Sequence, residues 1–154
     1  MHIAKSNFAL LATLLVAAHP ALAADDPNKG AIKARQGYFS MVKFNAGPLF
    51  GMAKGEMDYN PELAWHLATN LSQLGGVNTA RMWRKGSSVE QYKETEALPE
   101  IWAKPDEFRK REQALKDAIA ALAPAAGDGL DALRGGVKGL GKACKGCHDN
   151  FRAE

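Results

Sequence analysis

The sequence predicts an all-α protein, and three observations favour an antiparallel four-helix bundle. No segment shows the strict alternation of apolar and polar residues that is typical of a strand facing a core. Apolar residues recur instead at steps of three and four in four separate segments, the spacing that places side chains on one face of a helix. The chain has 154 residues, enough for one ordinary domain, so the four faces are expected to share a single core.

The start of the chain has the pattern of an export signal. A short basic start precedes an apolar run at residues 8–18, and Ala21 and Ala23 form an A-x-A cleavage pattern. An apolar run of this length is too short to span a bilayer as a helix. We therefore expect residues 1–23 to be a secretory signal peptide and residues 24–154 to form a domain that is exported to the periplasm.

The first helix is expected to begin near Asn28. Arg35 is the one charged residue on its inward face, and Gly47-Pro48 is expected to bend or loosen the helix, because proline removes a backbone donor. The inward positions are Ile32, Arg35, Phe39, Val42, Ala46, Leu49 and Ala53.

The second helix is expected to be short. Asn60 can cap it, Pro61 fits its first turn, and Gly75-Gly76 ends it. Its apolar positions are Leu63, Leu67, Leu71 and Leu74.

The stretch between Gly75 and Lys104 has no clear period. Such a long irregular segment is unusual in a small domain unless it covers something. Trp83 and Trp102 are candidates for that cover.

The last two helices are expected to open at Pro105 and near Asp128. The inward positions of the third are Phe108, Leu115, Ile119 and Leu122, and those of the fourth are Leu130, Leu133, Val137, Leu140, Cys144, Cys147 and Phe151. The fourth helix also holds five glycines, each costing about 1 kcal/mol relative to alanine. A large flat ligand pressed against the backbone would explain them.

The charge of the chain excludes some partners. Residues 1–23 hold one of the 20 basic residues and no acid, which leaves 19 basic and 17 acidic residues. Both signs are mixed through residues 104–117, as on a solvated helix face. Nucleic acid and an anionic membrane are therefore not expected as partners.

Residues 144–148 read CKGCH, a sequence compatible with a covalently held haem, a redox dithiol or part of a zinc site. C-x-x-C-H is the attachment pattern of c-type haem, in which two thiols add to the vinyl groups and the histidine binds the iron. Cys144 and Cys147 share one helix face, so both can reach a porphyrin edge. A redox dithiol usually lies at an exposed helix N-terminus, whereas these cysteines lie near the C-terminal end of the expected helix. A zinc site needs further ligands, and His66 is the only other histidine expected in the exported chain. Haem is the favoured alternative.

Four segments together resemble the cytochrome c′ family, the class II c-type cytochromes. They are RQGYF at 35–39, KGEMDYNPE at 54–62, PEIW at 99–102 and ACKGCHDNFR at 143–152, in family order. The resemblance implies an up-down-up-down bundle. It also implies one haem c attached through Cys144 and Cys147, with His148 as the iron ligand. Residues 82–98 depart from the proline and glycine turn common in relatives, so the resemblance leaves the conformation of 76–104 open.

The resemblance also implies roles for three other residues. Arg152 matches an arginine near the proximal side of the iron, and Arg35 one near a haem propionate. Phe39 matches the position that covers the open side of the iron, where low-spin relatives have methionine. Phenylalanine has no lone pair, so a five-coordinate, high-spin haem is expected. The alternatives are a helix-end cation for Arg152, a surface arginine for Arg35 and an ordinary core residue for Phe39.

An apolar pocket favours small neutral gases, so nitric oxide and carbon monoxide are the expected ligands, with Phe39 restricting the latter. Electron transfer to an unidentified redox partner is a further expected role, and no catalytic residue set is evident. Family members commonly pair through their first two helices, so a homodimer is expected, with Tyr38, Met41 and Asn45 as its face. The alternatives are a six-coordinate, low-spin electron-transfer cytochrome and a thiol oxidoreductase.

Overall fold

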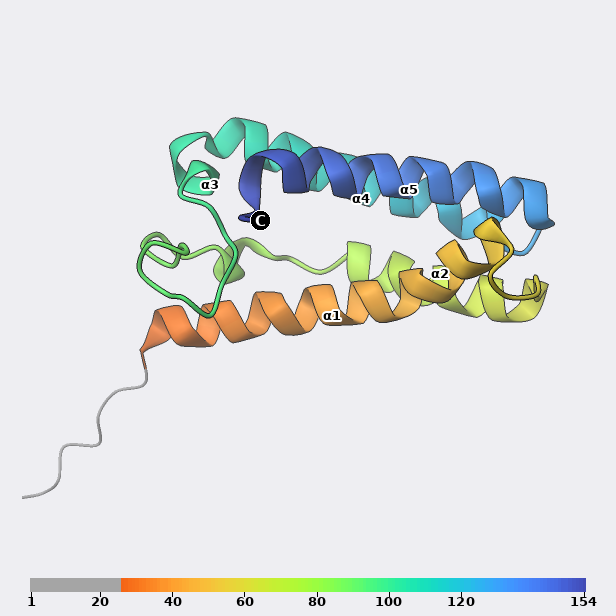
Figure 1. The fold of residues 1–154 in the computed structure, drawn as a ribbon, viewed down its shortest axis with the longest axis horizontal. Helices are drawn as coiled ribbons and strands as arrows, with labels where there is room; N and C mark the ends of the chain where they lie inside the picture. The colour runs from red at the N-terminus through yellow and green to blue at the C-terminus, as the bar shows by residue number, and fades with distance from the viewer. Residues whose placement is uncertain (1–25) are drawn as a thin grey trace, which may run out of the picture.

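The computed structural model describes residues 26–154, and the predicted signal peptide at 1–23 lies outside them. Four long helices form an antiparallel up-down-up-down bundle (Figure 1). They pack in a ring in the order α1, α2, α4, α5 and back to α1. Among residues 26–154, no helix has the length and hydropathy of a membrane span. The elements are α1 (Pro27–Lys54), α2 (Pro61–Gly75), η1 (Ala80–Met82), α3 (Glu100–Ala103), α4 (Pro105–Ala125) and α5 (Leu130–Phe151).

Local signals set the ends of α1 and α2. Asp26 caps α1 by accepting a hydrogen bond from Asn28 N, and Gly55 ends that helix with a φ of 79°, a conformation that favours glycine. Asn60 caps α2 by accepting from Leu63 N at 2.9 Å, as predicted. Pro48, which is expected to bend or loosen α1, does not end it, because the helix continues for six residues beyond the proline.

The difference in length between α1 and α2 makes room for the site. The 28 residues of α1 correspond to about 42 Å, and the 15 residues of α2 to about 22 Å. The crossover, residues 76–104, therefore covers the part of the bundle that α2 does not reach (Figure 1). The segment without helical periodicity thus takes the place that a longer α2 would occupy beside α1.

The crossover is tied to the C-terminal end of α5. Ala97 and Arg152 form an isolated antiparallel bridge. Leu98 N donates to Phe151 O at 3.0 Å, and Ala153 N donates to Glu96 O at 2.7 Å. These bonds fix the crossover against the turn of helix that follows His148.

Most of the buried apolar side chains of residues 26–154 form two clusters. The larger lies between the four long helices and includes Leu49, Leu71 and Leu140. The smaller joins the crossover to the start of α4 and the end of α5, through Ala97, Ile101, Phe108 and Phe151. Cys144 packs against the larger cluster and Cys147 against the smaller, so the C-x-x-C-H sequence lies where the two meet.

Two predictions about side-chain burial are wrong, one of an inward position and one of a dimer face. Leu63 is 39% exposed, because α2 presents Ala64 and Ala68 to the core, and these small residues let its neighbours approach closely. Tyr38 and Asn45, predicted on a dimer face, are buried within the chain. Tyr38 donates to Leu74 O, and Asn45 accepts a hydrogen bond from α2, so both side chains connect α1 to its neighbour.

Three of the five glycines of α5 lie close to other protein atoms, and the flat ligand expected from the sequence stays a prediction. A Cβ at Gly141 would lie 3.4 Å from Phe50, and one at Gly146 would lie 3.2 Å from Arg111. A Cβ at Gly136 would lie 2.7 Å from Leu122 Cδ1 and 3.2 Å from its Cα. Gly135, by contrast, has nothing within 4 Å of such an atom.

Gly136→Ala is therefore expected to lower the free energy of unfolding by about 1–3 kcal/mol, since α4 and α5 must move apart. Gly135→Ala, the matched control, is expected to raise it by up to about 1 kcal/mol through helix propensity. Denaturant unfolding of the pigmented protein measures both. Equal effects at the two positions would contradict close packing at Gly136.

Candidate functional site

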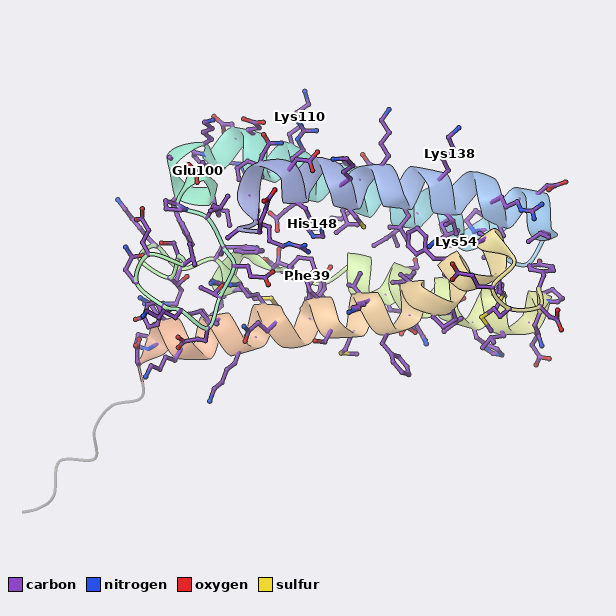
Figure 2. All side chains as sticks on the ribbon, viewed as in Figure 1. Phe39, Lys54, Glu100, Lys110, Lys138 and His148 are labelled. Carbon is purple, nitrogen blue, oxygen red and sulfur yellow. The ribbon has the colours of Figure 1, made fainter. Side chains whose placement is uncertain are left out.

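A cavity of about 720 Å³ lies between the two core clusters. Its walls come from α1, the crossover, α4 and the last turns of α5. Phe39 on α1 and His148 on α5 extend toward each other across the space between these helices (Figure 2). All six residues predicted for the site line this one cavity: Arg35, Phe39, Cys144, Cys147, His148 and Arg152.

The two cysteines are free and half-buried on one face of α5. Burial raises the pKa of the Cys144 thiol. Burial, followed by the negative charge of Glu112, raises the pKa of Cys147 to about 11. A thiol oxidoreductase depends on a lowered thiol pKa, so these surroundings argue against the dithiol alternative.

The imidazole of His148 lies beside a charged pair. Arg152 Nη1 is 3.4 Å from His148 Nδ1, and Arg152 Nε is 3.5 Å from a carboxylate oxygen of Glu96 in the crossover. Burial lowers the pKa of His148, and the charge of Arg152 lowers it further. Both effects favour the neutral imidazole, which is the form that binds a metal. Arg152 is thus both the residue that ends α5 and a neighbour of His148.

Arg35 is only 3% exposed, so the surface alternative for this residue is wrong. Its guanidinium donates to Met82 O at 3.2 Å, and to Oγ of Ser87 at 2.8 Å and O at 2.5 Å. It also donates to Thr95 Oγ1 at 2.7 Å. All four acceptors are neutral oxygens of the crossover, and the nearby haem propionate that the resemblance implies stays a prediction.

Phe39 differs from an ordinary core residue, because it is 37% exposed and borders the cavity. Its ring lies 6.2 Å from that of Trp83, centroid to centroid. Met41, two residues further along α1, is 55% exposed and does not line the cavity. Within the described part of the chain, no methionine lines the cavity.

Two residues of α4 at the cavity were missed in the sequence. Glu112 accepts hydrogen bonds from Thr79 and Trp83, and Arg111 has a buried Nε without a hydrogen-bond partner. Glu112 lies four residues after Phe108 and three before Leu115, so it occupies the predicted inward face of that helix. A charged residue on an otherwise apolar helix face is the sequence feature that could have identified Glu112 as a site residue, as it did for Arg35.

The residues present fit a haem. The cavity volume lies within the range of roughly 300–1,000 Å³ that is usual for cofactor sites. Two cysteines three residues apart face it from one helix, with the histidine beside them, and the buried Nε of Arg111 has no protein acceptor. The zinc alternative lacks a ligand set, since no three His, Cys, Asp or Glu side chains between residues 26 and 154 gather to hold a metal ion.

A four-helix bundle whose last helix presents C-x-x-C-H to a cofactor-sized cavity defines a bundle-type c cytochrome. The family model described as Cytochrome C' matches residues 30–152. The chain belongs to the cytochrome c′ family.

Individual relatives agree. A cytochrome c′ of Cereibacter sphaeroides is 41% identical over 145 residues, which are 94% of this chain and 97% of the relative. The structure of cytochrome c′ from Rhodobacter Spheriodes has a TM-score of 0.81 at 39% identity, covering 82% of this chain and 98% of that one. A nitric oxide complex of a mutant cytochrome c prime from Alcaligenes xylosoxidans has a TM-score of 0.71 at 28% identity, covering 82% and 97%.

Proposed function

We propose that this protein binds small neutral gases, nitric oxide foremost, at one five-coordinate, high-spin haem c, and that it also exchanges electrons with a redox partner. Cys144 and Cys147 would hold the haem through thioether bonds, and His148 would be its one protein ligand. When bound, the group supplies an iron centre able to take up a diatomic gas. The export pattern of residues 1–23 supports a periplasmic location, which fractionation of the native host would test.

One observation carries this proposal: Phe39 borders the cavity on the wall opposite His148 (Figure 2). A hydrocarbon ring cannot donate an electron pair, so it leaves a sixth position open to a small guest. Its bulk and apolar character favour uncharged ligands, which lose little hydration on entry. The nitric oxide complex of the Alcaligenes xylosoxidans relative supports the choice of gas.

The test is an optical and spin-state spectrum of protein matured in an export-competent host. The pigment should stay with the polypeptide after acid-acetone extraction. A broad Soret band with high-spin features is expected. A sharp low-spin alpha band in the reduced protein would instead identify the six-coordinate electron-transfer alternative, and a colourless protein would exclude both.

Phe39→Ala is expected to strengthen carbon monoxide binding at least about tenfold, equivalent to ~1.4 kcal/mol, by removing the bulk over the open side. Equilibrium titration of the reduced protein with carbon monoxide measures it. Met41→Ala is the matched control, since its side chain lies on the same helix but outside the cavity. Equal affinity in the Phe39 variant and the unaltered protein would remove Phe39 from this role.

We also propose a homodimer through the outer surface of α1. Phe44 is 78% exposed and Met41 55%, and both lie on this helix. Phe44→Glu is expected to weaken the dimer at least tenfold, because it places a charge in an apolar contact. Sedimentation equilibrium measures the change. Lys138→Glu, on the exposed side of α5 (Figure 2), is the control. A dimer undisturbed by Phe44→Glu would exclude this face.

A further inference from the structure

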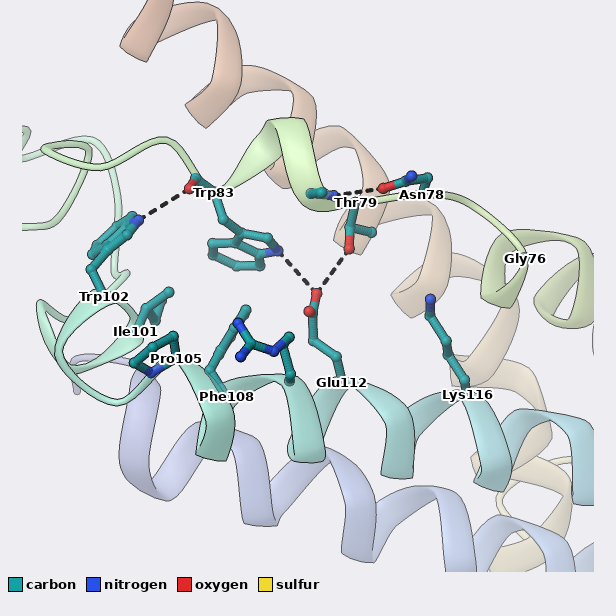
Figure 3. A pocket seen from close by; sticks show the side chains of 12 residues that line it. Gly76, Asn78, Thr79, Trp83, Ile101, Trp102, Pro105, Phe108, Glu112 and Lys116 are labelled. Carbon is teal, nitrogen blue, oxygen red and sulfur yellow. Dashed lines mark hydrogen bonds between the residues drawn. The ribbon is translucent and has the colours of Figure 1, made fainter.

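Glu112 stands in a wall between two cavities. It lines the 720 Å³ cavity of the site together with Thr79 and Trp83, and the same three residues line a second cavity of about 480 Å³. One carboxylate oxygen, Oε1, accepts from Thr79 Oγ1 at 2.8 Å and from Trp83 Nε1 at 3.0 Å (Figure 3). A single acidic group thus holds two donors that border the site.

Trp83 is the member of this trio whose ring packs against Phe39. Its ring packs against those of Phe39 and Phe108, at centroid distances of 6.2 and 4.8 Å. The guanidinium carbon of Arg35 lies 5.3 Å from the same ring centroid. The indole is therefore packed between Phe39, Phe108 and Arg35. Its N–H is directed to Glu112 rather than toward Phe39.

The orientation of this N–H decides the polarity of the pocket. An indole N–H can only donate, and a donor bound to a carboxylate is not available to a second acceptor. Hydrogen-bond donors beside a haem govern which ligands bind there. The pocket next to Phe39 is thus apolar partly because the Trp83 donor is occupied.

The charge of Glu112 also extends into the cavity. It adds to burial in raising the pKa of Tyr38, which lines the cavity from α1. Basic residues outnumber acidic ones in the lining, however: Arg35, Lys43, Arg111, Lys116 and Arg152 face Glu94, Glu96 and Glu112. The effect of Glu112 on a ligand therefore depends on the two donors that it binds.

We propose that Glu112 is a positioning residue that sets the ligand preference of the site: by accepting the hydrogens of Thr79 and Trp83 it withholds them from a bound ligand. The inference rests on the proposed gas-binding function. Without the carboxylate, both donors turn to a ligand or to a water molecule beside Phe39, and the pocket then favours polar and anionic guests.

The test uses four variants of the haem-loaded full chain: Glu112→Leu, Glu112→Gln, Trp83→Phe and the double variant Glu112→Leu/Trp83→Phe. The readouts are the C–O stretching frequency of the reduced carbon monoxide adduct and the azide affinity of the oxidised protein. Glu112→Leu is expected to lower the stretching frequency. It is also expected to bind azide about tenfold more tightly than Glu112→Gln, which loses the charge but keeps an acceptor.

The double variant and the single Trp83 variant identify the donor. Adding Trp83→Phe to Glu112→Leu is expected to move the frequency back toward that of the unaltered protein. Trp83→Phe alone is expected to leave it unchanged, because that N–H is already occupied. A shift in Trp83→Phe alone, or no shift in Glu112→Leu, overturns the inference.

The outcomes separate this inference from the proposed function. An unaltered protein that takes up no carbon monoxide contradicts the gas-binding function itself. An unaltered protein that binds the gas, with a frequency indifferent to Glu112→Leu, contradicts only the role of Glu112. If Glu112→Leu does not fold, Trp83→Phe and Thr79→Val decide, since a frequency shift in either shows that its donor already reached the ligand.

Discussion

Cys147→Ala is expected to yield a protein with little pigment that unfolds at least about 10 °C below the unaltered chain. The reason is the cavity of about 720 Å³ between the two core clusters. At about 24 cal/mol per Å³, even a quarter of that space left unfilled would cost ~4 kcal/mol, a large share of a typical stability of about 5–15 kcal/mol. Circular dichroism during heating, together with the pigment to protein ratio, measures the effect.

Lys145→Ala is the matched control for this variant. Lys145 lies between the two cysteines, but its side chain is exposed and pairs with Asp149 on the surface. Its loss is expected to change the free energy of unfolding by less than about 1 kcal/mol and to leave the pigment in place. Full stability of a pigment-free Cys147→Ala protein would show that the haem is not part of the core.

Arg35→Met is expected to lower the free energy of unfolding by at least about 3 kcal/mol, because buried acceptors in the crossover lose their donor. Met82 O, Ser87 O and Thr95 Oγ1 each accept from this guanidinium. Methionine replaces the aliphatic length but none of the hydrogen bonds. Hydrogen exchange should show faster opening of residues 87–97 than of α4, since the crossover loses its anchor to α1.

Gln36→Leu provides the comparison for Arg35. Gln36 is the next residue on α1 and donates to Glu94 O in the same crossover, at 2.5 Å, but this contact is exposed. Its removal is expected to cost less than about 1 kcal/mol. Similar losses in the two variants would mean that the buried hydrogen bonds of Arg35 are not what holds the crossover.

The helices and their ends were largely predictable. The expected starts near Asn28 and Asp128 compare with observed starts at Pro27 and Leu130, and the expected caps and stops of α2 are present. These features depend on residues within one or two turns of each other. Leu63 is the exception, because the large apolar residues of α2 suggest one inward face while the small residues Ala64 and Ala68 are the ones that face the core.

The site was predictable in part. The C-x-x-C-H sequence is local, so its placement on one face of α5 follows from helix geometry alone. The partner of Arg35 was not predictable, because the sequence shows a cation on an inward face without showing what it meets. Glu112 was missed for the same reason, since its donors Thr79 and Trp83 lie 33 and 29 residues away.

The sequence by itself determined the helical class, the family and the last helix with its two thiols and imidazole, because each depends on spacing within a few turns. The tertiary structure alone decided that Arg35 anchors the crossover and that Glu112 occupies the donors beside the pocket. Those hydrogen bonds join residues some 30 to 60 positions apart, so only the packing of the crossover against α1 and α4 brings them into contact.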